Sequence, residues 1–253
     1  MSTPPLSLQL YSLRDDSAKD FAATIQAVAA MGYEAVEFAG YHGLSAPELK
    51  KILDDCGLKS AGTHTALDTV SDDNLKETAE FNAILGNPTL IVPYVSPEQF
   101  GGREGALRLA EALTQASRTA AEFGAKVGYH NHAWEFQAEH GGGELPMELL
   151  AINTPPEVIL QVDTGNAQEG GGDPIPFIEK WRNRILTVHL KPFSKDFERY
   201  YIGEDDSNWE GILGALEGGP TQFIIVEQER YPEPNTPQDC VARCLKNLRA
   251  MGK

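Results

Sequence analysis

The chain has 253 residues and a formal net charge of −16 at pH 7, from 37 acidic and 21 basic side chains. This balance repels phosphate backbones, which argues against nucleic acid as the main partner. No apolar run approaches the ~20 residues of a membrane span, the first residues lack the pattern of a signal peptide, and cysteines are few, so we expect a cytoplasmic protein without a membrane partner.

Short apolar runs alternate with helical patterns along the whole chain. The average period of roughly 30 residues matches one strand, one helix and short loops. In most runs both the odd and the even positions are apolar. This is typical of parallel strands that are buried on both faces, by helices on one side and by the barrel interior on the other. We predict strands at Leu6–Tyr11, Tyr33–Phe38, Leu58–His64, Thr89–Tyr94, Lys126–Asn131, Val158–Asp163, Ile185–Lys191 and Gln222–Glu227.

The helix boundaries agree with these strands. Glycine, which adopts the left-handed conformation without a Cβ penalty, closes helical patterns at Gly32, Gly57, Gly86 and Gly124. Helix starts are predicted at two capping boxes and at two caps followed by proline: Ser45–Glu48, Ser207–Glu210, Asp173-Pro174 and Thr236-Pro237.

Eight strand–helix units without a break in composition predict one α/β domain over residues 1–253, a (β/α)8 TIM barrel. Alternation alone does not prove closure, so a doubly wound open sheet stays an alternative. A chain of this size buries about 70–75% of its unfolded surface and needs no disulfide support.

Unusual residues follow nearly every predicted strand. In a (β/α)8 barrel the working residues lie at the C-terminal strand ends, because the loops there form the open face. In this chain those positions hold Gln9 and Tyr11, Glu37, His64, Tyr94, His130 and His132, Asp163, His189 and Lys191, and Glu227. Four successive strands that end in His, Asp, His and Glu predict oxygen and nitrogen ligands for a divalent metal.

Each of these residues also has an ordinary explanation. Asp163, before Thr-Gly-Asn, could be a turn residue, and His189 could be a core histidine between two apolar neighbours. Glu227 could pair with Arg230, and Lys191 could form a buried ion pair with Asp163 or Glu37. Their joint occurrence at strand ends favours the metal site.

Six segments resemble the xylose isomerase-like barrel superfamily, within the group of sugar phosphate isomerases/epimerases and inosose dehydratase-like proteins. The resemblance extends over nearly the whole chain and is specific for the superfamily, but it indicates little about the substrate. The segments are Leu8–Asp15, Gly32–Phe38, Tyr129–Phe136, Asp163–Asn166, Val188–Lys191 and Val226–Glu229.

The resemblance implies one divalent metal ion, of Mn²⁺, Mg²⁺, Co²⁺ or Zn²⁺, held at the ends of strands five to eight. Asp163, His189 and Glu227 match three of the ligands. Many relatives end strand five with a glutamate where this chain has His130. We therefore expect Glu135 or His130 as the fourth ligand.

Strand alternation places Lys191 on the face of His189, and His132 on the face of His130. Lys191 could act as a base if burial lowers its pKa, or it could hold a substrate oxyanion. One of the two histidines could bind metal while the other moves protons. Substrate contacts are expected from Gln9, Glu37 and His64, with Tyr11, Tyr94 and Trp134 as apolar walls.

These features predict a metal-dependent isomerase or epimerase of carbohydrate metabolism, acting on a keto-sugar or cyclitol. The metal would stabilise the enediolate left when a C–H beside the carbonyl is deprotonated. Glu227 and an imidazole or Lys191 would exchange the protons.

Two alternatives stay open. Loss of a β-hydroxyl from the same intermediate would make the protein a dehydratase or lyase, of the inosose dehydratase or 3-keto-glycoside type, and the Tyr-His-Asn-His segment adds weight to this outcome. A non-catalytic sugar-binding barrel is the second. Six histidines and the acidity argue against a nuclease of the endonuclease IV type, and a homo-oligomer is compatible with the sequence.

Overall fold

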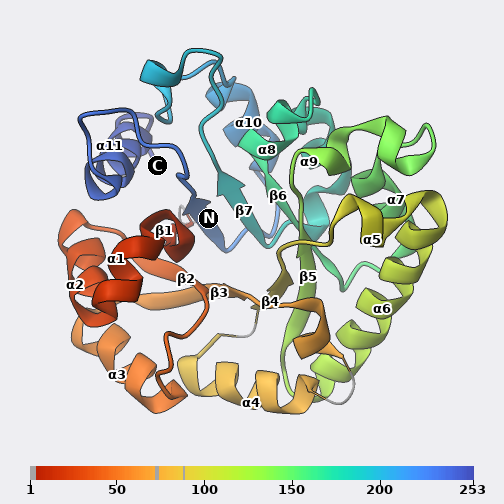
Figure 1. The fold of residues 1–253 in the computed structure, drawn as a ribbon, viewed down its shortest axis with the longest axis horizontal. Helices are drawn as coiled ribbons and strands as arrows, with labels where there is room; N and C mark the ends of the chain where they lie inside the picture. Colours follow the sequence, from red (N-terminus) through yellow and green to blue (C-terminus); the bar gives the residue numbers. More distant parts are fainter. Residues whose placement is uncertain (1–3, 72–73, 88) are drawn as a thin grey trace.

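A computed structural model describes residues 4–71, 74–87 and 89–253. Eight parallel strands, hydrogen-bonded in chain order, close into a barrel in which β1 pairs with β8 (Figure 1). The prediction of a TIM barrel is confirmed, and the open sheet is excluded. The strands are β1 (Leu6–Gln9), β2 (Ala35–Ala39), β3 (Lys59–His64), β4 (Thr89–Val92), β5 (Lys126–His130), β6 (Ile159–Asp163), β7 (Thr187–Leu190) and β8 (Phe223–Val226).

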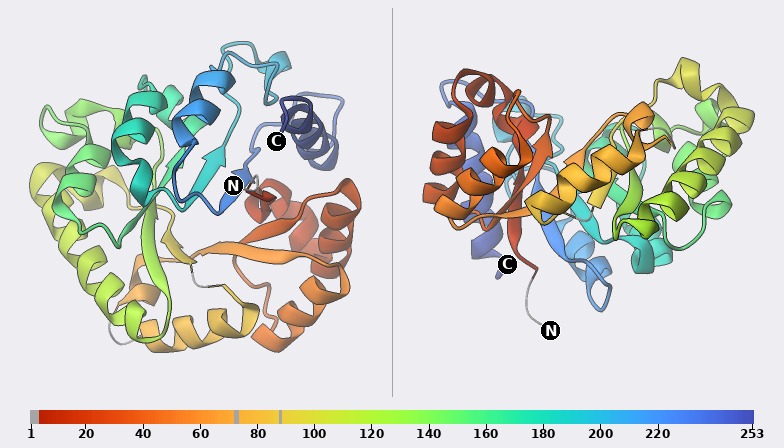
Figure 2. Two further views of the ribbon diagram at one scale, coloured as in Figure 1. Left: turned by 180° about the vertical axis from the view of Figure 1, so that it is seen from behind. Right: turned by 90° about the horizontal axis from the view of Figure 1, so that it is seen from below.

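Helices surround the barrel, and the last of them, α11, lies beside the first two, α1 and α2 (Figure 2). The α-helices are α1 (Arg14–Lys19), α2 (Phe21–Met31), α3 (Ala46–Asp55), α4 (Leu75–Leu85), α5 (Pro97–Phe100), α6 (Gly102–Glu122), α7 (Pro146–Asn153), α8 (Thr164–Glu169), α9 (Pro174–Trp181), α10 (Trp209–Leu216) and α11 (Pro237–Ala250). Short 3-10 helices are η1 (Leu10–Leu13), η2 (Leu67–Val70), η3 (Trp134–Phe136), η4 (Ala138–Gly141), η5 (Arg182–Arg184) and η6 (Phe197–Arg199). None of the helices in the described ranges has the length and apolar character needed to cross a bilayer.

Most of the predicted helix boundaries are confirmed. The four predicted glycines have positive φ, and helices begin after Ser45, Asp173 and Thr236 as expected. The box at Ser207 is wrong by one residue. Asn208 caps α10 by accepting a hydrogen bond from the Gly211 N–H, while the Ser207 hydroxyl donates to Asp205.

Two strands end two residues earlier than predicted, and this places two aromatic residues beyond the strand ends. β1 ends at Gln9, because the Gln9 Oε1 atom accepts a hydrogen bond from the Tyr11 N–H and the chain turns into η1. β4 ends at Val92, which places Tyr94 in the following loop. Both tyrosines are therefore free to lie at the mouth of the barrel.

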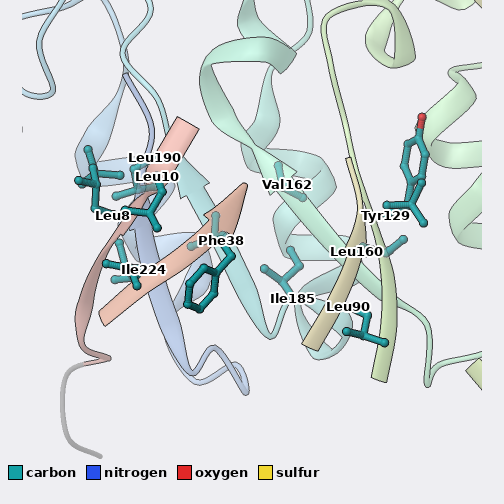
Figure 3. Packing of buried hydrophobic residues seen from close by; sticks show 14 of the residues in the cluster. Leu8, Leu10, Phe38, Leu90, Tyr129, Leu160, Val162, Ile185, Leu190 and Ile224 are labelled. Atoms are coloured by element: carbon teal, nitrogen blue, oxygen red, sulfur yellow. The ribbon is translucent and has the colours of Figure 1, made fainter. Parts of the chain in front are cut away.

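The strands direct large apolar side chains outward and mostly small or polar ones inward. Leu8, Phe38 and Leu160 belong to the core between the strands and the helices (Figure 3). Inside the barrel, Ala35, Ala61 and Ile225 form a separate, small apolar cluster. The inward positions nearer the C-terminal strand ends are polar and fully buried, for example Gln9, Glu37, Gln161 and His189. Buried polar groups are costly unless they are paired, so their hydrogen bonds define the site.

Candidate metal centre

Four buried side chains converge at the C-terminal ends of β5, β6, β7 and β8. They are His130, Asp163, His189 and Glu227, and their ligand-type atoms all lie within 4.8 Å of one another. Asp163 Oδ2 is 3.9 Å from His189 Nδ1 and 4.0 Å from His130 Nε2. Four donors at such distances around one point are suited to a single cation.

The two carboxylate oxygens of Asp163 have different surroundings. Oδ1 accepts a hydrogen bond of 2.7 Å from the Asn166 N–H, which caps α8. Asn131 holds the backbone of Asp163 on both sides, because its amide binds both the N–H and the carbonyl group of Asp163. Oδ2 is buried and has no hydrogen-bond partner among the described residues. Burial raises the pKa of Asp163 to about 7, because the ionised carboxylate is poorly solvated there. A cation bound at Oδ2 would stabilise the ionised form.

His189 lies between two carboxylates. Its Nδ1 atom is 2.5 Å from Glu227 Oε2, and its Nε2 atom is 2.6 Å from Glu37 Oε2. Burial disfavours the imidazolium, but Glu37 and Glu227 outweigh this effect and raise the pKa of His189 to about 10. Without a metal, a proton therefore stays on the Nδ1 atom that faces Asp163 and Glu227.

The donor set fits a divalent ion. Two imidazoles and two carboxylates are ligands of Zn²⁺, Mn²⁺ and Co²⁺, and Asp163 Oδ2 is a buried carboxylate oxygen without a hydrogen-bond partner in the described structure. A second group of three imidazoles, His64, His130 and His189, shares two members with the first. Because His130 and His189 belong to both groups, only one of the two groups can bind an ion at a time.

Glu37 lies next to this cluster and holds His189 and its neighbours in place through hydrogen bonds. Its Oε2 atom lies 2.6 Å from both Gln9 Nε2 and His189 Nε2, and its Oε1 atom accepts a hydrogen bond of 2.7 Å from Gln161. A Cβ atom at Gly62 would come within 2.7 Å of Glu37 Oε1, so the glycine leaves room for the carboxylate. The imidazoles of His64 and His189 outweigh the burial of Glu37 and lower its pKa.

The predicted substrate contacts of Glu37 and Gln9 do not fit this arrangement. Both side chains are 0% exposed, and their polar atoms already bind one another and their neighbours. We reassign both residues to the support of the cluster.

Glu135, one of two candidates for the fourth ligand, lies outside the cluster. Its carboxylate accepts hydrogen bonds of 2.7 Å from the Tyr129 hydroxyl and from the His132 N–H. Burial raises the pKa of Glu135 to about 8. Glu135 therefore holds the loop after β5, and His130 occupies the fourth position in the cluster.

Lys191 is buried beside Glu227 and Glu229. Its Nζ atom is 2.8 Å from Glu229 Oε2 and 3.4 Å from Glu227 Oε1. Burial disfavours the ammonium, but Glu227, Asp163 and Glu229 outweigh it and hold the pKa of Lys191 well above its usual range. The condition under which Lys191 could act as a base, a lowered pKa, is therefore not met, which leaves the alternative of a cation that could hold a substrate oxyanion.

The remaining predicted residues lie around the cluster at different depths. The His132 ring is 4.9 Å from that of Tyr94 and 5.3 Å from that of His130. Burial lowers the pKa of His132 to about 4, and its buried Nδ1 atom has no hydrogen-bond partner within the described part of the chain. Tyr11 and Tyr94 are about half exposed, at 46% and 48%.

Two further predictions concern Trp134 and His64. Trp134 is only 7% exposed and packs against Phe100, so it does not form the expected wall. His64 is largely buried, and its Nε2 atom is 2.8 Å from Gln161 Oε1, so the side chain joins the support of the cluster.

Gln161 was not predicted as part of the site. It lies two residues before Asp163 on β6 and therefore points into the barrel with it. A glutamine between Leu160 and Val162, at the parity of a candidate ligand, could have indicated this position from the sequence.

Comparisons with known proteins identify the family of this chain. The model of the family described as xylose isomerase-like TIM barrel matches residues 25–248. Inosose dehydratase from Clostridium tetani is 36% identical over 164 residues, which cover 56% of this chain and about half, 53%, of that protein. The rhizopine catabolism protein MocC from Rhizobium meliloti is 27% identical over 265 residues, covering 87% of this chain and 78% of the relative. A crystal structure of a sugar phosphate isomerase/epimerase from Parabacteroides distasonis, 27% identical, superimposes with a TM-score of 0.83 and covers 98% of both chains.

Proposed function

This chain belongs to the xylose isomerase-like TIM barrel family, and we propose that it is a divalent-metal-dependent isomerase or epimerase. Its substrate class would be a keto-sugar or a cyclitol that carries a carbonyl group. The names of the relatives, among them inosose dehydratase and sugar phosphate isomerase/epimerase, support sugar or cyclitol chemistry.

One observation carries the proposal: the convergence of His130, Asp163, His189 and Glu227 at one end of the barrel. The unpaired Oδ2 atom of Asp163 lies inside this group. A bound divalent ion would supply Lewis-acid polarisation of a carbonyl and its neighbouring hydroxyl. That polarisation would make the adjacent C–H more acidic, as abstraction of its proton to give an enediolate requires.

The chain's own residues would then handle the proton. His132 is the side chain best suited to accept it, because its lowered pKa keeps the imidazole neutral and its Nδ1 atom is free of partners in the described structure. Lys191 would hold a substrate oxygen that gains negative charge, since Glu227 and Glu229 keep the ammonium charged. Tyr94, in contact with the His132 ring, would cover the apolar face of the substrate.

Dehydration is the second candidate, and the position of Lys191 favours it. A buried ammonium next to a site of proton abstraction can hydrogen-bond to a departing β-hydroxyl group, which would leave as water with the abstracted proton. The 36% identity to an inosose dehydratase points in the same direction. Both outcomes start from the same enediolate, so product analysis separates them.

The test is a screen of keto-sugars, inososes and 3-keto-glycosides with added Mn²⁺ or Co²⁺ in D₂O, followed by NMR of the products. We expect turnover that requires the metal and deuterium at the carbon beside the carbonyl. A new double bond would indicate dehydration, and a changed configuration or a shifted carbonyl would indicate epimerisation or isomerisation. Turnover without any deuterium incorporation would refute the enediolate. A chain that binds sugars but neither binds metal stoichiometrically nor turns substrate over would be a binding barrel.

A further inference from the structure

We propose that Gln161 is a positioning residue that sets which ring nitrogens of His64 and His130 carry protons. It would thereby select His130, and not His64, as the imidazole that completes the metal centre. This inference rests on the proposed metal-dependent function and adds a residue that defines the ligand set.

The surroundings of Gln161 determine how its amide is turned. The Nε2 atom is 2.7 Å from Glu37 Oε1 and 2.8 Å from the Thr187 hydroxyl oxygen. Glu37 already accepts hydrogen bonds from Gln9 and His189, which keep its carboxylate ionised. An ionised carboxylate only accepts hydrogen bonds, so the NH₂ group of Gln161 must face it. The amide oxygen is then directed to the opposite side.

Two imidazoles meet this amide oxygen. Gln161 Oε1 lies 2.8 Å from His64 Nε2 and 3.1 Å from His130 Nδ1. A carbonyl oxygen has no proton to give, so both of these nitrogens must be N–H donors. In a neutral imidazole the other nitrogen then carries the lone pair.

The consequence differs between the two rings. The lone pair of His130 is on Nε2, the atom 4.0 Å from the unpaired Oδ2 of Asp163. The Nε2 atom of His64 carries a proton towards Gln161 and Glu37, so this nitrogen offers no lone pair to a cation. Gln161 thus presents the lone pair of His130 to the group with two carboxylates and withdraws the Nε2 atom of His64 from metal binding.

The direct test is the tautomer of His130 in the metal-free, ¹⁵N-labelled protein. Two-bond ¹H–¹⁵N correlation spectra distinguish the two neutral tautomers, and the spectrum of His130→Asn assigns the signals. We expect protonated Nδ1 and unprotonated Nε2 for His130. The opposite tautomer in the unaltered chain would overturn the inference, whether or not any variant folds.

Variants then test the cause. Gln161→Met keeps the length of the side chain and removes the acceptor, so we expect a mixture of His130 tautomers and about 10- to 100-fold weaker Co²⁺ affinity by calorimetry. In Gln161→Glu, a protonated carboxyl group at position 161 could donate to Glu37 and accept from His130. This variant should therefore recover the single His130 tautomer. Thr187→Val is the matched control, because it removes only the second partner of Gln161 Nε2 and should leave tautomer and affinity unchanged.

The outcomes separate this inference from the proposed function. If Gln161→Met leaves both the tautomer and the Co²⁺ affinity as they were, Gln161 is not a positioning residue, although the metal-dependent function can stand. If the unaltered chain binds no Co²⁺, the proposed function fails and the selection of a metal ligand by Gln161 fails with it, even when the tautomer is as expected.

Discussion

The two halves of the barrel use the same kinds of side chain for different purposes. The strands β5–β8 end in His130, Asp163, His189 and Glu227, which form the candidate metal centre. The strands β1–β3 carry Gln9, Glu37 and His64. Gln9 and His64 both contact Glu37, and Glu37 in turn binds His189. Neither a carboxylate nor an imidazole is a ligand merely because it lies at a strand end.

The two groups differ in whether their buried polar atoms already have hydrogen-bond partners. Glu37 is as deeply buried as Asp163, yet both of its oxygens accept hydrogen bonds, while Asp163 Oδ2 has no partner among the residues that the structure describes. A saturated carboxylate positions its neighbours, and an unsaturated one attracts a cation. The following predictions test this contrast, from the largest expected effect to the smallest.

The Asp163→Asn variant should lose Co²⁺ binding, by more than about 100-fold in affinity, because the amide removes the charge of the free oxygen. The Asn side chain can still cap α8 through its oxygen, so the fold should persist. Calorimetry and metal analysis measure the effect. Asp173→Asn makes the same change at the cap of α9 and should bind Co²⁺ normally; full metal content in Asp163→Asn would remove Asp163 from the site.

The Lys191→Met variant should lower turnover by about 100-fold or more while its metal content stays high. The reason is that the ammonium would hold developing charge on the substrate and would not bind the ion. Steady-state kinetics and metal analysis on one preparation give both values. Lys195→Met, an exposed lysine four residues later, is the control. Unchanged turnover would exclude a role for Lys191.

The Glu37→Gln variant should weaken Co²⁺ binding by about 10- to 100-fold, less than the change at Asp163, because Glu37 acts through the His189 ring. Competition with a chelator measures the affinity. Glu34→Gln, near the start of the same strand, serves as the control. A loss as large as that of Asp163→Asn would contradict the division of the barrel into ligands and support.

The apparent metal affinity should rise between pH 6 and pH 8, by about tenfold per pH unit for each proton that binding displaces. The pKa values of about 7 for Asp163 and about 10 for His189 lie above their usual ones, so the metal-free site holds protons in this range. Because these protons compete with the ion, a lower pH must weaken binding. Calorimetry in buffers of different ionisation enthalpy counts the protons; a pH-independent affinity would be inconsistent with these ligands.

The smallest effect is expected at Tyr94. Tyr94→Ala should raise KM by about 3- to 10-fold, because it removes an aromatic face next to His132 and leaves the cluster intact. Tyr94→Phe keeps that face and should behave like the unaltered chain in steady-state kinetics. Equal effects of both variants would assign the role to the hydroxyl group instead.

The sequence predicted the strands closely, because the alternation of side chains and the glycine and capping patterns are local properties. It also predicted that Asp163, His189 and Glu227 would lie close together at one end of the barrel. It left Glu135 and His130 as alternatives for the fourth ligand, since both lie near the end of β5. Only the tertiary structure shows the contacts with Tyr129 and His132 that hold Glu135 outside the cluster. The role of Gln161 was not predicted, because it depends on partners that are up to 124 residues away in the chain.

The order of amino acids was thus enough to specify the barrel and the rim on which its chemistry would lie. The tertiary structure decided the surroundings of each residue: Glu37 binds its neighbours with both oxygens, Lys191 pairs with two glutamates, and Asp163 keeps one oxygen without a partner among the described residues. The physical reason is that strand geometry follows from neighbouring residues, whereas the charge and availability of a buried polar atom depend on groups that distant strands bring within about 3 Å of it.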